Sequence, residues 1–70
     1  MVNQMVLSTE IEWIGYDDQR QMLQVEFIAG PIYQYQNVSR EVYDSFLGAE
    51  SHGRFFADQV KGKYEHRRIR

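Results

Sequence analysis

The 70-residue sequence contains no cysteine, a single proline and no long apolar run. Without cysteine there are neither disulfide bonds nor thiolate metal ligands. No apolar stretch approaches the roughly 20 residues of a membrane-spanning helix, and residues 1–7 lack the charged and apolar segments of a signal peptide. We therefore expect a cytoplasmic protein with no membrane partner, whose core consists of aliphatic and aromatic side chains.

Charged side chains make up 26% of the chain and are unevenly distributed. The formal net charge is −2. Residues 1–50 carry two basic and eight acidic side chains, whereas residues 51–70 carry six basic and two acidic ones. The total argues against a domain that binds nucleic acid with its whole surface, but the basic C-terminal segment favours a contact with an acidic partner.

Alternating apolar and polar residues predict three β-strands. The predicted strands are residues 7–16, 22–28 and 32–36. The connections between them are short and polar or contain glycine, which is typical of an antiparallel meander. Pro31 cannot donate a hydrogen bond to a neighbouring strand, so the third strand is expected at an edge of the sheet.

The turn between the second and third strands decides which way the two central tyrosines point. A three-residue loop over 28–30, with Gly30 at a positive φ, places Val25 opposite Tyr33 and Leu23 opposite Tyr35. A two-residue loop would turn the tyrosines to the polar face. The first register matches apolar residues with one another and is the one we expect.

Two helices are predicted after the strands. Ser39 is a suitable N-cap for the first, which ends at Gly48, and Ser51 is a suitable N-cap for the second, which ends at Gly62. Their apolar residues recur at helical spacing. They are Val42, Tyr43, Phe46 and Leu47 in the first helix, and Phe55, Phe56 and Val60 in the second. Residues 63–70 are expected to be extended or frayed.

The predicted fold class is α+β, a three-stranded antiparallel β-meander followed by two short helices packed on one face. We expect one domain over residues 1–66 and a basic tail over 67–70. The helix-facing side of the sheet is predicted to carry Ile11, Trp13, Leu23, Val25, Phe27, Tyr33 and Tyr35. The other side retains an apolar patch, which indicates either a tail folded over it or self-association. That patch consists of Ile14, Tyr16, Met22 and Ile32.

An ordered series of residues resembles the KTSC domain, a family named for its occurrence at the C-terminus of some lysyl-tRNA synthetases and also found as a small free-standing bacterial protein. The series covers about residues 7–66. It comprises Ile11-x-x-Ile14-Gly15-Tyr16-Asp17, Leu23-x-Val25-x-Phe27, Gly30, Tyr33-x-Tyr35, Val38, Val42-Tyr43, Leu47, Ser51-x-Gly53, Phe55-Phe56 and Gly62-Lys63-Tyr64.

The function of that family is not established, and its attachment to a tRNA-charging enzyme suggests RNA binding by association only. The positions that match the family pattern and that the resemblance carries over are Tyr33, Tyr35, Phe56, Lys63 and Tyr64. The final arginines lie at or beyond the edge of the pattern and inherit nothing from it.

The first functional hypothesis is binding of RNA, either tRNA-like or single-stranded, by the basic C-terminal segment. Its candidate residues are Lys61, Lys63, Tyr64, Arg67, Arg68 and Arg70. Tyr33 and Tyr35 are further candidates as base-stacking residues. Each assignment has a structural alternative, because buried tyrosines are common in small cores and charged segments are commonly solvated.

The second hypothesis is a protein-interaction or self-association domain that uses the patch of Ile14, Tyr16, Met22 and Ile32. Catalysis is not expected, because no serine has a recognisable base partner and no phosphate-binding glycine motif is present. His52 and His66 are far apart in sequence and form no metal-ligand spacing. We expect no cofactor, no metal and no small-molecule substrate.

Overall fold

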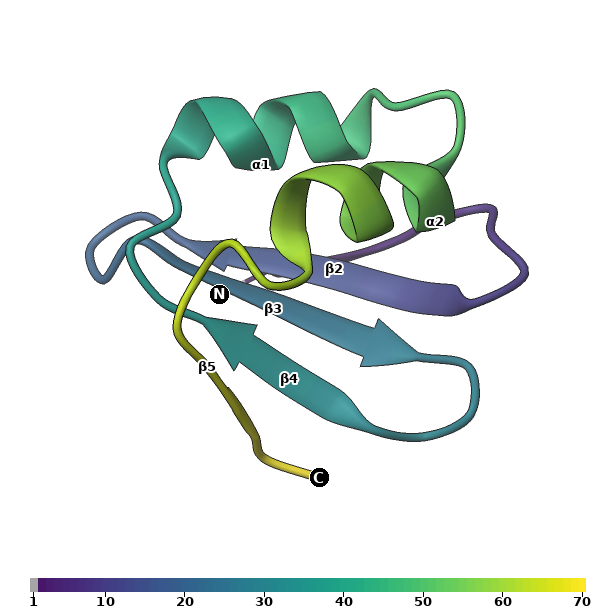
Figure 1. The fold of residues 1–70 in the computed structure, drawn as a ribbon, viewed down its shortest axis with the longest axis horizontal. Helices are drawn as coiled ribbons and strands as arrows, with labels where there is room; N and C mark the ends of the chain where they lie inside the picture. The colour runs from purple at the N-terminus through teal and green to yellow at the C-terminus, as the bar shows by residue number, and fades with distance from the viewer. Residues whose placement is uncertain (1) are drawn as a thin grey trace.

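Within residues 2–70, five antiparallel strands form one sheet, and two helices, the second of which continues into a π-helical turn, cover one of its faces (Figure 1). This computed structural model describes residues 2–70. The strands are β1 (Val2–Met5), β2 (Ile11–Asp17), β3 (Met22–Phe27), β4 (Ile32–Tyr35) and β5 (His66–Arg68), in the spatial order β1-β2-β3-β4-β5. The helical segments are α1 (Arg40–Leu47), α2 (His52–Phe55) and η1 (Phe56–Val60). The α+β class is confirmed, but the prediction of three strands is wrong.

The two strands missing from the prediction are the edges of the sheet. β5 consists of one histidine and two arginines, all exposed, so it has no apolar alternation. Backbone hydrogen bonds hold it, with Gln36 N donating to Glu65 O and Ile69 N to Ile32 O, both at 2.8 Å. β5 therefore occupies part of the segment expected to be frayed, and it covers β4, which is not an edge strand.

The register between β3 and β4 is the predicted one. Val25 lies opposite Tyr33 and Leu23 opposite Tyr35. Gly30 has a φ of +119°, and Phe27 N donates to Pro31 O at 2.9 Å. The three-residue loop thus places both tyrosines on the same side as Val25 and Leu23, which are fully buried.

A bulge in β2 reverses the predicted direction of several side chains. The register shifts between Ile11, which lies opposite Phe27, and Trp13, which lies opposite Glu26. A bulge adds one residue to one strand, so the residues beyond it change faces. Ile14 and Tyr16 consequently join the core beneath the helices, whereas Trp13 moves to the opposite, outer face. The predicted faces of these three residues are wrong.

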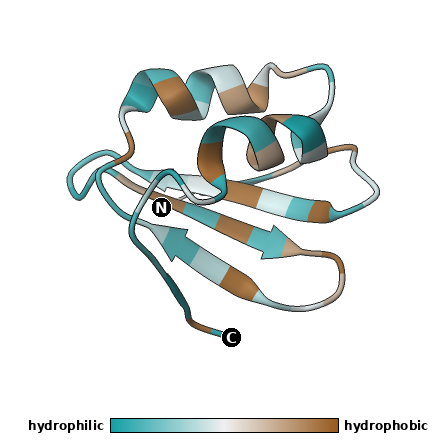
Figure 2. Cartoon of the chain, viewed as in Figure 1, coloured by the Kyte–Doolittle hydropathy of each residue, from teal (hydrophilic) through white to brown (hydrophobic). Residues whose placement is uncertain are grey.

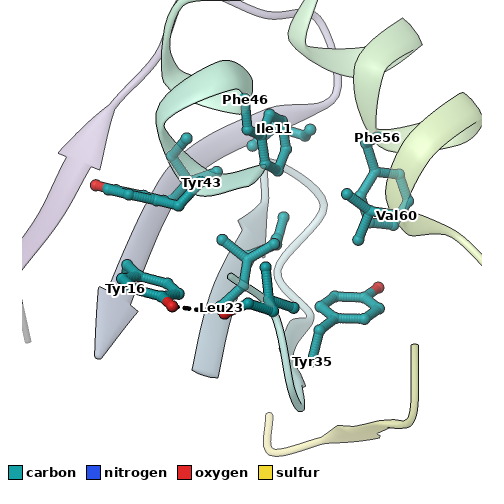
Figure 3. Packing of buried hydrophobic residues seen from close by; sticks show 11 residues of the cluster. Ile11, Tyr16, Leu23, Tyr35, Tyr43, Phe46, Phe56 and Val60 are labelled. Carbon is teal, nitrogen blue, oxygen red and sulfur yellow. Dashed lines mark hydrogen bonds between the residues drawn. The ribbon is translucent and has the colours of Figure 1, made fainter. Parts of the chain in front are cut away.

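The first helix begins as predicted. The Ser39 hydroxyl accepts a hydrogen bond from Val42 N at 3.3 Å, which satisfies one of the unpaired N–H groups at the helix start. Val38 and Tyr43 are both buried in the core. Tyr43 stacks on Tyr16, with ring centroids 5.1 Å apart, and the Tyr16 hydroxyl donates to the carbonyl of Val38 (Figure 3).

The second helix also begins at its predicted cap, where Ser51 Oγ accepts from Arg54 N at 3.2 Å. It then widens into the π-helical turn η1, in which Lys61 N donates to Phe56 O at 2.8 Å. Phe56 and Val60 face the sheet above Tyr35 (Figure 3). Figure 2 shows that β5, by contrast, is hydrophilic. No helix within residues 2–70 is long and apolar enough to cross a membrane.

Candidate functional site

A groove with a volume of about 860 Å³ lies between η1, the β3–β4 turn and the strands β4 and β5. The helices lie over β2 and β3, and β4 and β5 extend beyond them (Figure 1). Part of the helix-facing side of the sheet is therefore left open. Five aromatic rings line this opening. They belong to Phe27, Tyr33, Tyr35, Phe56 and His66.

Three of the rings, those of Tyr33, Tyr35 and His66, form a row that we call the platform. The other two, Phe27 and Phe56, form a wall beside it. Tyr35 lies at similar tilts to both of its platform neighbours, 34° from Tyr33 and 33° from His66, with centroids 6.4 and 5.5 Å away. Strand pairing explains this row, because His66 lies opposite Tyr35 on the adjacent strand. Phe27 and Phe56 stand nearly perpendicular, at 84° to Tyr33 and 73° to Tyr35 respectively. Phe27 and Phe56 therefore flank the row through edge-to-face contacts.

The two tyrosines have different roles in this platform. Tyr35 is buried and belongs to the core, as the structural alternative predicted. Burial, followed by the neighbouring Tyr33, raises the pKa of Tyr35 to about 12. Tyr33 is only half-buried and packs at the margin of the core. The more accessible of the two rings, and the one a ligand can reach, is therefore that of Tyr33, with Tyr35 beside it in the row.

Two of the predicted basic residues lie near the groove. Lys61 follows η1 directly and lines the groove. Arg68 lies opposite Tyr33 in the β4–β5 pair, so it is on the same face of the sheet. Lys63 is exposed two residues after Lys61, with its backbone N–H bonded to Val60 O at 3.0 Å. Positive charge is thus concentrated at the β5 side of the groove.

The remaining predicted residues lie elsewhere. Arg67 is opposite Gln34 and on the outer face. The Arg70 guanidinium contacts the Glu26 carboxylate at 3.1 Å. Tyr64 is half-buried against the core and lines a separate small pocket with Val42. The structure therefore divides the basic segment between the two faces of the sheet.

The groove margin carries polar groups without internal partners. Within residues 2–70, no side-chain hydrogen bond or ion pair engages the Glu10 carboxylate, the Lys61 ammonium group or the Tyr33 hydroxyl. An apolar pocket with a few convergent polar groups is the usual form of a ligand site. Sequence reasoning missed both Glu10 and Phe27 as groove residues, because only the fold brings Phe27 against Phe56 of η1 and Glu10 beside Gly53 of α2.

The residues predicted to form a self-association patch offer no exposed surface. The exposed fractions of Ile14, Tyr16, Met22 and Ile32 are 0%, 8%, 6% and 8%. Ile14 and Tyr16 face the helices because of the β2 bulge. Met22 and Ile32 are absent from the main core cluster, which is consistent with the predicted outer face, but they are buried there.

Two aspartates lie together away from the groove. Asp18 and Asp44 both contact the Arg40 guanidinium, at 2.7 and 3.1 Å, beside the β2–β3 turn. These hydrogen bonds raise the pKa of Arg40. Within residues 2–70, no group of three or more histidine, aspartate or glutamate side chains is arranged to hold a metal ion.

Comparison with known proteins assigns a family. The model of the KTSC domain matches residues 7–64. A protein of Tsukamurella paurometabola is 44% identical over 61 residues, which cover 87% of this chain and 91% of that protein. An uncharacterized protein of Stutzerimonas stutzeri is 40% identical over 57 residues, covering 81% and 80% respectively. The crystal structure of a KTSC domain protein from Yersinia pestis matches with a TM-score of 0.93 and 40% identity, covering 99% of this chain and 97% of that one.

Proposed function

The chain belongs to the KTSC domain family, and from the geometry of its groove we propose that it is a non-catalytic module that binds single-stranded RNA. The observation that carries the proposal is the juxtaposition of an aromatic platform with two basic side chains that form no ion pair within residues 2–70. The half-exposed ring of Tyr33 lies in the groove that Lys61 lines, and Arg68 is its neighbour on β5.

Each part of this arrangement matches one part of a nucleotide. A base stacks on an aromatic face with a contribution of about 1–3 kcal/mol. The phosphate that follows it is neutralised by a lysine or arginine at the edge of the platform. Tyr33 supplies the face, and Lys61 and Arg68 supply the charges.

The shape of the groove favours a single strand over a duplex. The platform is bounded by the upright rings of Phe27 and Phe56. A base has to leave its stack to enter such a space, which is how sequence-reading modules take unpaired loops and ends of RNA. The acidic side chains around Arg40 lie at another part of the surface, so they do not oppose a strand bound at β5. An RNA partner is also consistent with the cytoplasmic location expected from the sequence.

Fluorescence anisotropy with a labelled single-stranded RNA at low salt tests the proposal. We expect Tyr33→Ala to weaken binding by roughly tenfold, in line with the loss of one stacked base, and Lys61→Ala to weaken it and reduce its salt dependence. Arg67→Ala is the control, because it also removes one positive charge, but from a residue of β5 that lies on the opposite face of the sheet from Tyr33 and Arg68. Absence of binding at about 100 micromolar protein, the weak limit of non-specific nucleic-acid affinity, would overturn the proposal.

Self-association through the outer face is the second candidate, on different residues from those predicted. Met5 lies opposite Trp13 on that face, and its side chain is 66% exposed. Sedimentation velocity across a concentration series tests this candidate. A concentration-dependent dimer that Met5→Lys abolishes would support it, and a monomer at every concentration would exclude it.

A further inference from the structure

Within residues 2–70 the Glu10 carboxylate has no hydrogen-bond or ion-pair partner, and it lies at the margin of the groove opposite the basic side. It lies in the connection between β1 and β2, immediately before Ile11. Its backbone is held at both ends, since Glu10 N donates to Ser8 Oγ at 3.1 Å and Glu10 O accepts from Ile28 N at 2.9 Å. These contacts place its side chain beside the start of α2.

The first turn of α2 leaves room for this carboxylate. A Cβ atom at Gly53 would lie 3.5 Å from Glu10 Oε1 and 3.6 Å from its Cδ. The side chain thus packs over a residue that has no side chain of its own. Glu10 is nevertheless exposed and lines the groove together with Lys61 and Tyr33.

The groove is therefore electrically asymmetric across the platform. Lys61 and Arg68 lie on the η1 and β5 side, and Glu10 lies on the side of the β1–β2 connection. A nucleotide bound on Tyr33 is oriented by this asymmetry, because its phosphate is attracted to the two cations and repelled by the carboxylate. The edge of the base is then the part that meets Glu10.

We propose that Glu10 makes this groove selective for guanine in single-stranded RNA, a specificity that rests on the function proposed above. An ionised carboxylate only accepts hydrogen bonds, and its two oxygens can accept two at once. Guanine is the one standard base whose Watson–Crick edge carries two adjacent donors, N1–H and the exocyclic N2 amino group. The carboxylate of Glu10 takes both hydrogen bonds while the ring stacks on Tyr33.

The other bases meet Glu10 less favourably. Adenine and cytosine each offer one amino donor next to a ring nitrogen whose lone pair faces the second carboxylate oxygen. Uracil offers one N–H between two carbonyl oxygens, both of which repel the carboxylate. A bidentate contact of this kind discriminates between bases by a factor of about ten or more.

The experiment compares four pentamers, UUGUU, UUAUU, UUCUU and UUUUU, which differ only in the central base. Their affinities for the wild-type chain, for Glu10→Gln and for Glu50→Gln are measured by fluorescence anisotropy in competition with a labelled strand. Glu50→Gln is the matched control. It removes the same charge from an exposed residue that lies at the same end of the molecule and lines a neighbouring pocket instead of the groove.

We expect the wild type and Glu50→Gln to prefer UUGUU by about tenfold, and Glu10→Gln to lose most of that preference. The affinity of Glu10→Gln for UUUUU is expected to be unchanged or higher, because a negative charge leaves the groove. Equal binding of all four pentamers by the wild type would overturn guanine selectivity and leave the proposed function intact. Absence of binding to every pentamer would overturn both. A guanine preference that survives in Glu10→Gln would show that another residue reads the base.

Discussion

Removing the hydroxyl of Tyr16 should destabilise the domain substantially. The hydroxyl donates to the carbonyl of Val38, and both residues are buried. Tyr16→Phe keeps the ring that stacks on Tyr43, but it leaves a buried carbonyl without its donor. Such a loss costs about 1–3 kcal/mol. At 0.05–0.15 kcal/mol per residue, the whole chain is stabilised by only about 4–10 kcal/mol, so one hydroxyl accounts for a large part of the total.

Urea unfolding and thermal unfolding, each followed by the fluorescence of Trp13, the single tryptophan, measure the effect. For a loss of about 2 kcal/mol, we expect the thermal midpoint to fall by roughly 8–16 °C, and the urea midpoint to fall with an unchanged m-value. Tyr33→Phe is the control, because no residue within 2–70 hydrogen-bonds to the Tyr33 hydroxyl. A wild-type midpoint for Tyr16→Phe, or an equal loss for Tyr33→Phe, would refute the reasoning.

Three further predictions concern stability. Burial raises the pKa of Tyr35 to about 12. The contribution of this shift to the free energy of unfolding is therefore fully present below about pH 10, the pKa of a tyrosine in the unfolded chain, and is lost as the pH rises toward 12. Urea midpoints measured across that range should fall less steeply for Tyr35→Phe than for the wild type. A Cβ atom at Gly30 would have no other atom within 4 Å, so the loss of stability in Gly30→Ala, which we expect to be about 1–3 kcal/mol, comes from the φ of +119° alone. Gly48 has a φ of −87°, and Gly48→Ala should show no such backbone penalty in the same urea assay. Ser39→Ala removes the cap of α1 and should cost about 1 kcal/mol by circular dichroism during thermal unfolding, whereas Ser39→Asp should retain most of it.

The sequence predicts those parts of the fold in which local chemistry decides the outcome. The register of β3 and β4 follows from Gly30 and from matching Val25 with Tyr33, and both caps follow from serine before an apolar run. The bulge in β2 is different, because no glycine or proline marks it between Ile11 and Trp13. An error of one residue there reverses every side chain that follows.

β5 could not be predicted for a related reason. A strand is recognised by alternation, but an edge strand whose side chains are all exposed requires none. Its stability comes from backbone hydrogen bonds to β4, which the identity of Arg67 or Arg68 does not reveal. The lining of the candidate groove could therefore be anticipated only in part. The basic segment and the two tyrosines were identified, whereas the wall from Phe27 and Phe56 and the carboxylate of Glu10 depend on contacts between distant segments.

The order of the strands has a consequence for how this domain can be attached to other molecules. A continuous row of paired residues crosses the sheet from Val2 through Tyr16, Leu23 and Tyr35 to His66. Four strand spacings separate its ends, a distance of about 19 Å. A tag, a surface tether or a neighbouring domain joined before β1 therefore leaves the groove accessible. The same addition after Arg70 begins at the β5 edge, beside Ile32, whose N–H donates to Arg70 O, and close to Pro31 of the groove lining. We expect it to obstruct the groove, so the end chosen for immobilisation decides whether a binding assay reports on the groove.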